Sequence, residues 1–397
     1  MTLNKGIWGW NKSATVAHII SKSLTLLFVA SIISLNSATS QETRSQEIGK
    51  KLTAIKLSEN DVRIFVDGDF FAEYRSDYKG TPIVWPICAP NGSLATRAWP
   101  MIEDVDASVE KDNQMKNVLF NAVLAERNGV KDHPHHRSFW FNHGDVDRGD
   151  FWGGTPSKIR QTKFVSLEES EDKVILVTEN AWFNDKTKSD VCKDVRRVTF
   201  SAGNINGKDV RIIDFSVEIT PVKEKVVFGD TKEGSFGIRV PSPTAVTSKK
   251  INSKWGGSIV NDAGEKDGDT WSKRSKWVNY VGPAAKRLND AELSAYIKDE
   301  KLEAPLATIG IAVLDGRNSL GERPWRHVRD YGLFASNPFG RHDFENNVKA
   351  DGSQTLRKGE TMFFNFRTIF HDGNLTNEEI NAAFEEYDAE QNSGDVR

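Results

Sequence analysis

The chain is poor in the features that define several large protein classes. Its 397 residues include only two cysteines and no Gly-rich phosphate loop, GxSxG or HExxH motif, so the usual signals of P-loop, α/β-hydrolase and zincin chemistry are missing. Positive charge is not in excess, because 53 Lys and Arg stand against 56 Asp and Glu. This balance argues against a general nucleic-acid binder, which needs a basic face. With 38% hydrophobic and 27% charged residues, the composition is that of a globular protein.

Only one apolar run approaches the length of a membrane span, and it lies near the N-terminus. Leu24–Leu35 is mostly apolar, it follows a flank with three lysines and no acids, and small residues precede Gln41. Twelve residues are too few to cross a bilayer as a helix, whereas this order of features is typical of a secretory signal peptide. We predict a signal peptide over 1–40, cut near Ser40, and a periplasmic or secreted protein without membrane contact after cleavage.

Loss of residues 1–40 would leave 50 basic and 56 acidic residues, a net charge of −6. In an oxidising compartment the two cysteines, Cys88 and Cys192, could form a disulfide. Sequence does not show whether their Cα atoms come within bonding reach, so a disulfide and two separate buried thiols both stay open.

The patterns beyond residue 57 are mainly those of strands. Apolar residues alternate with polar ones over Ile213–Thr220 and Met362–His371, and Asn206-Gly207 is a hairpin-turn signal. Further strands are predicted at Val62–Val66, Lys173–Thr178, Val195–Ala202, Gly237–Val240, Thr308–Leu314 and Tyr331–Ala335.

Helix signals are few. Thr376 and Glu379 form a capping box before an apolar face of Ile380, Ala383, Phe384 and Tyr387. A second helix is predicted over 116–126.

Many strands, few helices and no strand–helix alternation predict a mainly β fold. We expect one large antiparallel β-sandwich over 57–388 with a C-terminal helix, a polar lead-in over 41–56 and a flexible tail over 389–397.

Four of the eight histidines lie within eleven residues, in the run DHPHHRSFWFNHGDVDRGDFWGG over 132–154. One hypothesis is a metal site, because His133 and His135 would share one face of a strand about 6.6 Å apart, with His136 facing the other way. His143 could join them only if the chain turned. A second hypothesis is acid/base and binding chemistry on a sugar, and a third is a structural hydrogen-bond frame.

This run closely resembles the signature of the bacterial "PmoA family", roughly DHPHHRGLWFGHGDVNGVDFW. Further blocks agree in order: GDFFAEYRSDYKGTPIVWPICAPNGSLATRAWPM (68–101), GDTKEGSFGIRV (229–240), KWVNYVGP (276–283) and WRHVRDYGLFASNPFG (325–340). The resemblance covers about 60–380. Ser138 departs from the family's Gly, and Asp147-Arg148 from its Asn-Gly.

The resemblance implies an exported protein of polysaccharide-degrading bacteria and a sandwich similar to the supersandwich of galactose mutarotases. The family name comes from a methane monooxygenase subunit, which is a polytopic membrane protein. The present chain has no span after the predicted signal, so we do not expect it to be a genuine methane monooxygenase.

Two other regions carry candidate site residues. In the first, Lys232 and Glu233 precede a short strand with Arg239, and Glu233 could be a general base whose pKa Lys232 lowers. In the second, the alternating Trp325, His327, Arg329 and Tyr331 could form one wall of a cleft, with Asn337 ending the next strand.

Together these residues predict a cleft where three regions of the chain meet. We assign catalytic roles to His135, His136, His143 and Glu233, with a histidine as acid and Glu233 as base. Substrate-binding roles are assigned to Arg137, Trp140, Asp145, Lys232, Arg239, Trp325, His327, Arg329 and Asn337. No cofactor is certain, and a divalent metal would use His133 and His135.

The predicted function is action on a sugar or keto-sugar by epimerisation, elimination or hydrolysis. A non-catalytic carbohydrate-binding protein and a metal-dependent enzyme stay open as alternatives. The expected partner is a carbohydrate or small polar substrate, not nucleic acid.

Overall fold

The computed structural model describes residues 50–105, 110–299 and 302–393. The predicted signal peptide and its cut near Ser40 lie outside these residues. Contacts group Gly49–Arg397 into one compact unit. Within the described ranges, no helix has the length and apolar character needed to cross a membrane.

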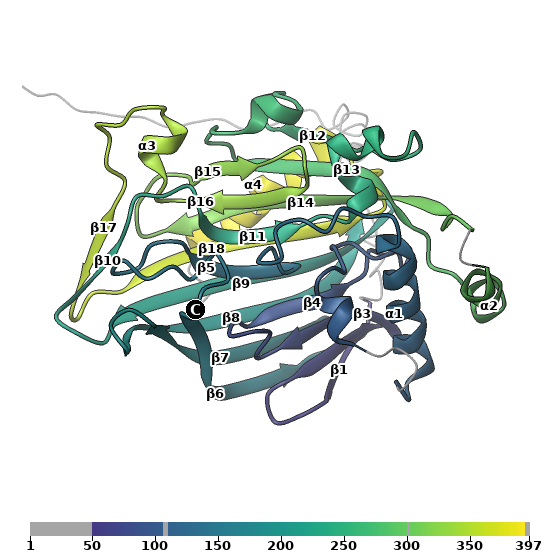
Figure 1. Cartoon of the computed structure of the whole chain (residues 1–397), viewed down its shortest axis with the longest axis horizontal. Helices are drawn as coiled ribbons and strands as arrows, with labels where there is room; N and C mark the ends of the chain where they lie inside the picture. The colour runs from purple at the N-terminus through teal and green to yellow at the C-terminus, as the bar shows by residue number, and fades with distance from the viewer. Residues whose placement is uncertain (1–49, 106–109, 300–301, 394–397) are drawn as a thin grey trace, which may run out of the picture. The chain divides into compact units, whose positions relative to one another are not determined.

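Two eight-stranded sheets, with antiparallel pairing throughout, make up the body of this unit (Figure 1). In spatial order, the first sheet contains β1 (Leu52–Lys56), β2 (Val62–Val66), β3 (Asp69–Arg75), β4 (Ile83–Ile87), β5 (Phe139–His143), β11 (Gly234–Arg239), β16 (Leu333–Asn337) and β15 (Trp325–Val328). The second contains β12 (Ser258–Asn261), β13 (Trp277–Ala285), β14 (Leu306–Asn318), β18 (Met362–His371), β9 (Lys208–Pro221), β8 (Ser189–Ile205), β7 (Lys173–Asn184) and β6 (Lys158–Glu169). A separate pair is formed by β10 (Lys225–Phe228) and β17 (Gln354–Arg357).

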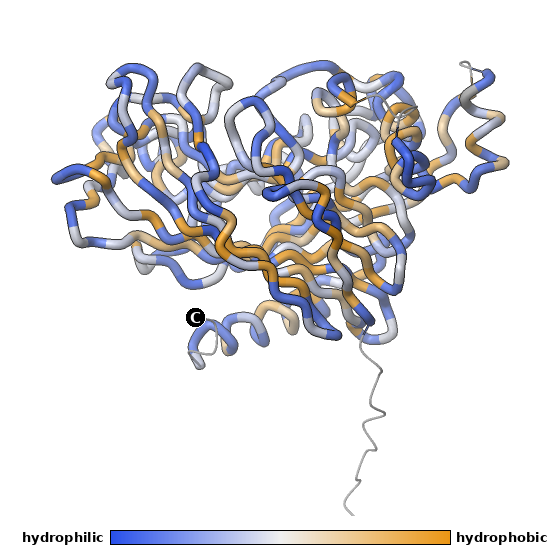
Figure 2. The backbone as a smooth tube through the Cα atoms, turned by 90° about the horizontal axis from the view of Figure 1, so that it is seen from below, coloured by the Kyte–Doolittle hydropathy of each residue, from blue (hydrophilic) through white to orange (hydrophobic). Residues whose placement is uncertain are grey.

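The main core lies between the two sheets and is rich in phenylalanine. Phe236 of β11 stacks on Phe366 of β18, with ring centroids 4.4 Å apart, and Phe139 of β5 meets Phe215 of β9 edge-on at 6.0 Å. Along the strands, hydrophobic positions predominate, while hydrophilic positions gather in the loops (Figure 2). Burial of one face of each sheet against the other is the expected consequence of alternating patterns, and it confirms the predicted mainly β sandwich.

The helices are α1 (Asn113–Glu126), α2 (Asp290–Lys298), α3 (Arg341–Phe344) and α4 (Asn377–Ser393), with 3₁₀ turns at Met101–Asp104, Ser242–Thr244, Val246–Lys250 and Asp267–Thr270. The two longest helices pack on the outer faces of the sheets, α1 against the first sheet and α4 against the second. The predicted capping box of α4 is confirmed: Thr376 Oγ1 accepts from Glu379 N at 3.3 Å, and Glu379 Oε2 accepts from Thr376 N at 2.8 Å. Ile380, Phe384 and Tyr387 are buried with Trp277 and Leu314 of the second sheet.

Turn and strand predictions hold at most positions. Asn206 and Gly207 join β8 to β9 with φ of 50° and 79°, as a type I′ hairpin requires. The predicted strands over Val62–Val66 and Met362–His371 have the observed bounds. The predicted helix over 116–126 lies within α1.

Several boundaries differ from prediction; β7, β8 and β14 are longer than predicted, and β11 covers Gly234–Arg239 in place of Gly237–Val240. Leu52–Lys56, in the predicted lead-in, forms β1 because Leu52 is buried and this stretch pairs with β2. The predicted tail over 389–397 is helical through Ser393, since Arg317 donates to Gln391 O at 3.1 Å. Tyr331 precedes β16, which begins at Leu333.

Of the two possibilities left open for the cysteines, the structure shows the second: Cys88 and Cys192 are separate buried thiols.

A buried ion pair connects the two sheets. The Arg196 guanidinium of β8 bonds both carboxylate oxygens of Asp194 at 3.0 and 3.1 Å and donates to Phe141 O of β5 at 3.2 Å. Asn180 and Trp182 also donate to Asp194, at 2.6 Å each. Each oxygen of the Asp194 carboxylate therefore accepts two hydrogen bonds from these three side chains.

Replacing Arg196 by alanine would leave Asp194 buried without its cation. We expect a loss of about 3–5 kcal/mol in the free energy of unfolding, measured by urea denaturation. Lys193→Ala, on the exposed face of the same strand, is the matched control and should change it by less than about 0.5 kcal/mol. Equal midpoints for the two variants would contradict this role.

Candidate functional site

A cleft of about 440 Å³ opens on the first sheet where three separate regions of the chain meet. Its lining residues are His133, His135, His136, Gly144, Asp150, Trp152, Gly153, Thr231, Lys232, Glu233, His327, Arg329 and Tyr331. They belong to the segments around β5, before β11 and around β15, and these strands are close together in the order β5-β11-β16-β15. Trp140 and Trp152 pack in a cluster apart from the inter-sheet core, which holds Phe139 and Phe141.

The histidine run is a turn and not the predicted strand. His136 N donates to His133 O at 3.0 Å, with Pro134 inside the turn, a position that suits its fixed φ. The turn stacks the His133 and His136 rings at 4.9 Å, and His135 meets His136 edge-on at 4.4 Å. The prediction that His136 faces away from its neighbours is therefore wrong, because a turn gathers side chains that a strand would separate.

The Asp132 carboxylate holds this turn in place. Its Oδ1 accepts from Arg97 at 2.6 Å and from Arg239 at 2.7 Å, and its Oδ2 lies 2.9 Å from His133 Nδ1. We call this group the Asp132 bridge. Although partial burial opposes ionisation, the two guanidinium groups lower the pKa of Asp132 to about 2.

Arg239 determines the tautomer of His136. Its Nη1 lies 3.0 Å from His136 Nδ1, and because a guanidinium can only donate, this ring nitrogen must accept. The proton of the neutral ring is then on Nε2, so His136 is a hydrogen-bond donor toward its other side. Burial, aided by the charge of Arg239, holds the pKa of His136 well below its ordinary value.

His327 has the opposite tautomer. Its Nδ1 lies 2.7 Å from Lys232 O, and a carbonyl can only accept, so Nδ1 carries the proton and Nε2 keeps a free lone pair. Burial lowers the pKa of His327 to about 4, and that of His135 as well. At neutral pH the cleft therefore contains an uncharged donor, His136, and an uncharged acceptor, His327.

Glu233 is half-buried beside Lys232. The Lys232 Nζ lies 3.7 Å from Glu233 Oε1 and 3.8 Å from Asp343 Oδ1. We predict from sequence that Lys232 lowers the pKa of Glu233. It does contribute in that direction, but burial is the larger effect and the pKa of Glu233 is raised.

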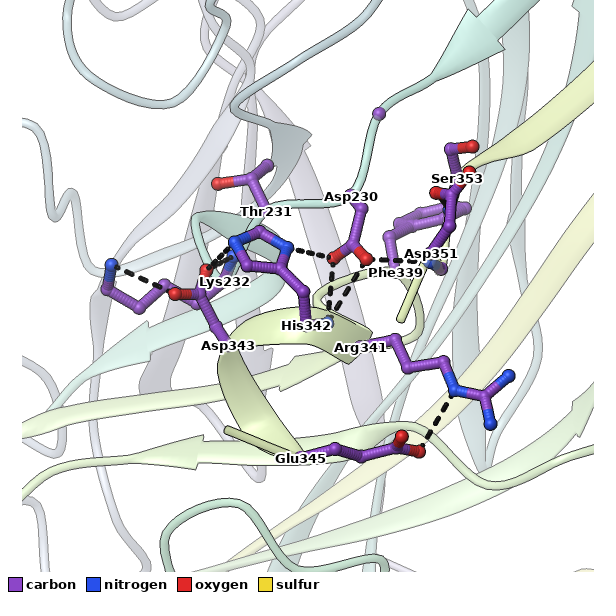
Figure 3. A network of polar contacts seen from close by, with 12 residues as sticks. Asp230, Thr231, Lys232, Phe339, Arg341, His342, Asp343, Glu345, Asp351 and Ser353 are labelled. Atoms are coloured by element: carbon purple, nitrogen blue, oxygen red, sulfur yellow. Dashed lines mark hydrogen bonds and ion pairs between the residues drawn. The ribbon is translucent and has the colours of Figure 1, made fainter. Parts of the chain in front are cut away.

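The segment that directly precedes Glu233, residues 230–232, is fixed by α3 and the chain after it (Figure 3). Asp230 accepts from the backbone N of His342 and, at 2.6 Å, of Gly352, and lies 2.9 Å from His342 Nδ1. Asp343 Oδ2 accepts from Lys232 N at 3.0 Å. Asn337, predicted to bind substrate, donates to Thr231 O at 2.8 Å.

The loop after β5 provides a second carboxylate. Asp150 Oδ1 accepts from the backbone N of Trp152 and Gly153 at 2.8 Å each. This leaves Oδ2 of Asp150 without a cation partner in the described part of the chain. Asp150 and Trp152 belong to the histidine-rich run over 132–154. Thr231 was not predicted from the sequence and is added to the cleft lining by the structure.

Several predicted site residues lie behind the cleft and not on its surface. His143 is fully buried, with Nε2 2.8 Å from Gly229 O, and Trp140 is buried beneath His136 with ring centroids 5.7 Å apart. Arg239 is buried in the Asp132 bridge. These side chains position the lining, so the catalytic role predicted for His143 and the binding roles predicted for Trp140 and Arg239 do not fit their places.

Three further residues point elsewhere. Arg137 donates to Tyr78 O at 3.0 Å, Asp145 accepts from Arg148 N at 2.9 Å in its own turn, and Trp325 stacks on Phe344. Each predicted binding role rested on a strand face or on proximity in sequence, and the backbone turns these side chains away.

A three-ligand metal centre is not present among the described residues, where no three His, Cys, Asp or Glu side chains group around a common point. The His133 and His135 rings are 5.7 Å apart, but Nδ1 of His133 is taken by Asp132. His133 can therefore offer only Nε2 as a ligand.

Sequence reasoning missed the partners that determine the cleft's electrostatics. Asp132 directly precedes the histidine run, but its two arginines are 35 and 107 residues away. Asp343 gave no signal of its own, because nothing in the local pattern of its region points toward the cleft.

Fold and site together define an antiparallel β-sandwich protein with a histidine- and carboxylate-lined cleft on one sheet. The chain belongs to the Family of unknown function (DUF6807), whose model matches residues 61–385. None of the curated proteins compared with the chain matches it.

Asp132→Asn should destabilise the protein by about 2 kcal/mol at pH 7, because it removes the charge between two guanidinium groups. The folded pKa of Asp132 is depressed, so its stabilisation is present above about pH 4 and is lost as pH falls toward 2. Thermal unfolding across this range should show the wild-type and variant curves converging at the acid end. Asp269→Asn, at an exposed position, should follow wild type throughout; a gap that persists at pH 2 would contradict the bridge.

Proposed function

We propose that the cleft binds a carbohydrate and that Glu233 transfers a proton to or from it. The observation that carries the proposal is the pair of uncharged imidazoles with opposite tautomers, His136 and His327, beside a half-buried carboxylate. A sugar hydroxyl is both donor and acceptor, so it can accept from His136 or donate to His327. Trp152 and Tyr331 also line the cleft, but Trp152 is buried against Trp140 and Tyr331 stacks on His133, so these rings shape the cleft wall.

Glu233 is better suited than the histidines to carry the proton. At pH 7 an imidazole with a pKa of about 4 is protonated in about one molecule in a thousand, so the histidine acid expected from the sequence would rarely be charged. A raised carboxyl pKa lies closer to the working pH, where general acid–base catalysis is most effective. We therefore assign binding roles to His136 and His327 and proton transfer to Glu233.

A carbohydrate ligand also agrees with the resemblance to the PmoA family. That resemblance implies an exported protein of polysaccharide-degrading bacteria. Epimerisation, elimination and hydrolysis all require a positioned proton carrier of this kind. The proposal concerns this step and these residues, and it holds for any of the three reactions.

Glu233→Gln keeps the shape of the side chain and removes its proton transfer. On a panel of oligosaccharides followed by NMR, we expect turnover to fall roughly 10²- to 10⁴-fold, while affinity measured by calorimetry changes little. Glu386→Gln, on an exposed face of α4, should behave as wild type. Binding without turnover in the wild-type protein would overturn the catalytic part and favour a carbohydrate-binding protein.

The pH profile gives a second test. If Glu233 acts as a base, activity should rise with pH through a midpoint above the ordinary pKa of a glutamate, because burial raises it. Lys232→Met removes a charge that lowers this pKa, so the midpoint should move to higher pH. Lys358→Met, at an exposed ion pair with Glu224, should leave the midpoint in place; a downward shift in Lys232→Met would contradict the assignment.

A further inference from the structure

Arg329 is the cation of the cleft that the protein does not neutralise. Its backbone is fixed in the β15–β16 hairpin, with N donating to Leu333 O at 2.8 Å and O accepting from Gly332 N at 3.0 Å. Its guanidinium forms no ion pair or side-chain hydrogen bond with the described residues. It lies 5.5 Å from the Trp271 ring centroid and 5.8 Å from that of Tyr331, so two aromatic rings hold it while its N–H groups stay available.

Neighbouring arginines differ from Arg329 in this respect. Arg97 and Arg239 share Asp132, Arg326 bonds Asp315 at 3.0 Å in the protein interior, and Arg274 bonds Glu322 at 2.7 Å. An unpaired guanidinium lining a cleft is therefore a local exception. Arginine's planar fork of donors matches the oxygens of a carboxylate or related oxyanion.

The other charged residues of the cleft determine which ligand charge Arg329 can bind. Lys232 lies between Glu233 and Asp343, so its charge is already balanced. The negative charge of Asp150 contributes toward a higher pKa of His135 and of Glu233. The positive charge of Arg329 contributes toward a lower pKa of His327 and of Tyr331. Glu233 also acts on Tyr331, so the carboxylates form no separate acidic end. Among the described lining residues, Arg329 is the cation with no carboxylate at ion-pair distance.

We propose that the sugar bound here carries a single negative charge, a carboxylate or a sulfate ester, and that Arg329 binds it. The Tyr331 hydroxyl, which bonds no described residue, is a second donor for the same group. One uncompensated cation matches a monoanion better than the dianion of a phosphomonoester. This inference rests on the proposed function, because it specifies the ligand of the same cleft.

The test compares matched trisaccharides by calorimetry: galacturonate, 6-O-sulfated galactose and neutral galactose, each against wild type and Arg329→Gln. We expect wild type to bind at least one anionic trisaccharide roughly 10- to 100-fold more tightly than the neutral one. Arg329→Gln should reduce that affinity to the neutral level, and Arg329→Lys should restore part of it. Added salt should weaken anion binding in wild type but not in Arg329→Gln. The two anionic arms distinguish carboxylate from sulfate.

Arg160→Gln, at an exposed ion pair on β6, is the matched control and should bind all three sugars as wild type does. Equal affinity of wild type for charged and neutral trisaccharides, no measurable binding of either anion, or anion binding unchanged in Arg329→Gln would each overturn the inference. Failure here is separable from failure of the proposed function. Neutral sugars turned over in a Glu233-dependent way would refute only the role of Arg329. Arg329-dependent anion binding without Glu233-dependent turnover would refute only the proton transfer.

Discussion

The cleft depends on one carboxylate that two arginines share. Asp132 joins the segment before the first sheet's β5 to Arg97 and to Arg239 at the end of β11. Through Arg239 this bridge also determines which nitrogen of His136 accepts a hydrogen bond. The tautomer of His136 is therefore determined by Asp132 and Arg239, which do not line the cleft, as is common where outer partners orient the groups of a site.

Burial is the main cause of the lowered pKa values of His135, His136 and His327, and the positive charge of Arg239 adds to it at His136. Arg239 and its neighbours disfavour a proton on His136, and burial acts in the same direction. Under the proposed function, the uncharged rings of His136 and His327 would recognise the ligand, and the proton would move through Glu233, whose pKa burial raises.

Sequence patterns predicted the sandwich well because alternation reports directly on which face of a strand is buried. The strands over Val62–Val66 and Met362–His371, the Asn206-Gly207 hairpin and the cap of α4 all follow from local rules. The site was only partly predictable. Residue type and clustering pointed to His135, Glu233, His327 and Arg329, which do line one cleft.

Orientation was the part that local patterns could not supply. Whether an arginine faces a ligand or an aspartate depends on a partner far away in the chain, as for Arg239, or on a carbonyl across a loop, as for Arg137. The H-x-H spacing fits a strand or a turn equally well, and tertiary contacts of Asp132 decide in favour of the turn. For Glu233, burial and the charge of Lys232 have opposite effects on the pKa, and which effect is larger depends on the three-dimensional packing.

The attachment of segment 230–232 to α3 has a consequence for how the cleft can diversify. Asp230 is bonded by His342 and Gly352, and Lys232 by Asp343, yet none of these three partners lines the cleft. Insertions or charge changes between β16 and β17 can therefore move Lys232 and Glu233 without replacing any residue that lines the cleft. Selection for a new ligand could act on this peripheral segment while the sheets and their core stay unchanged.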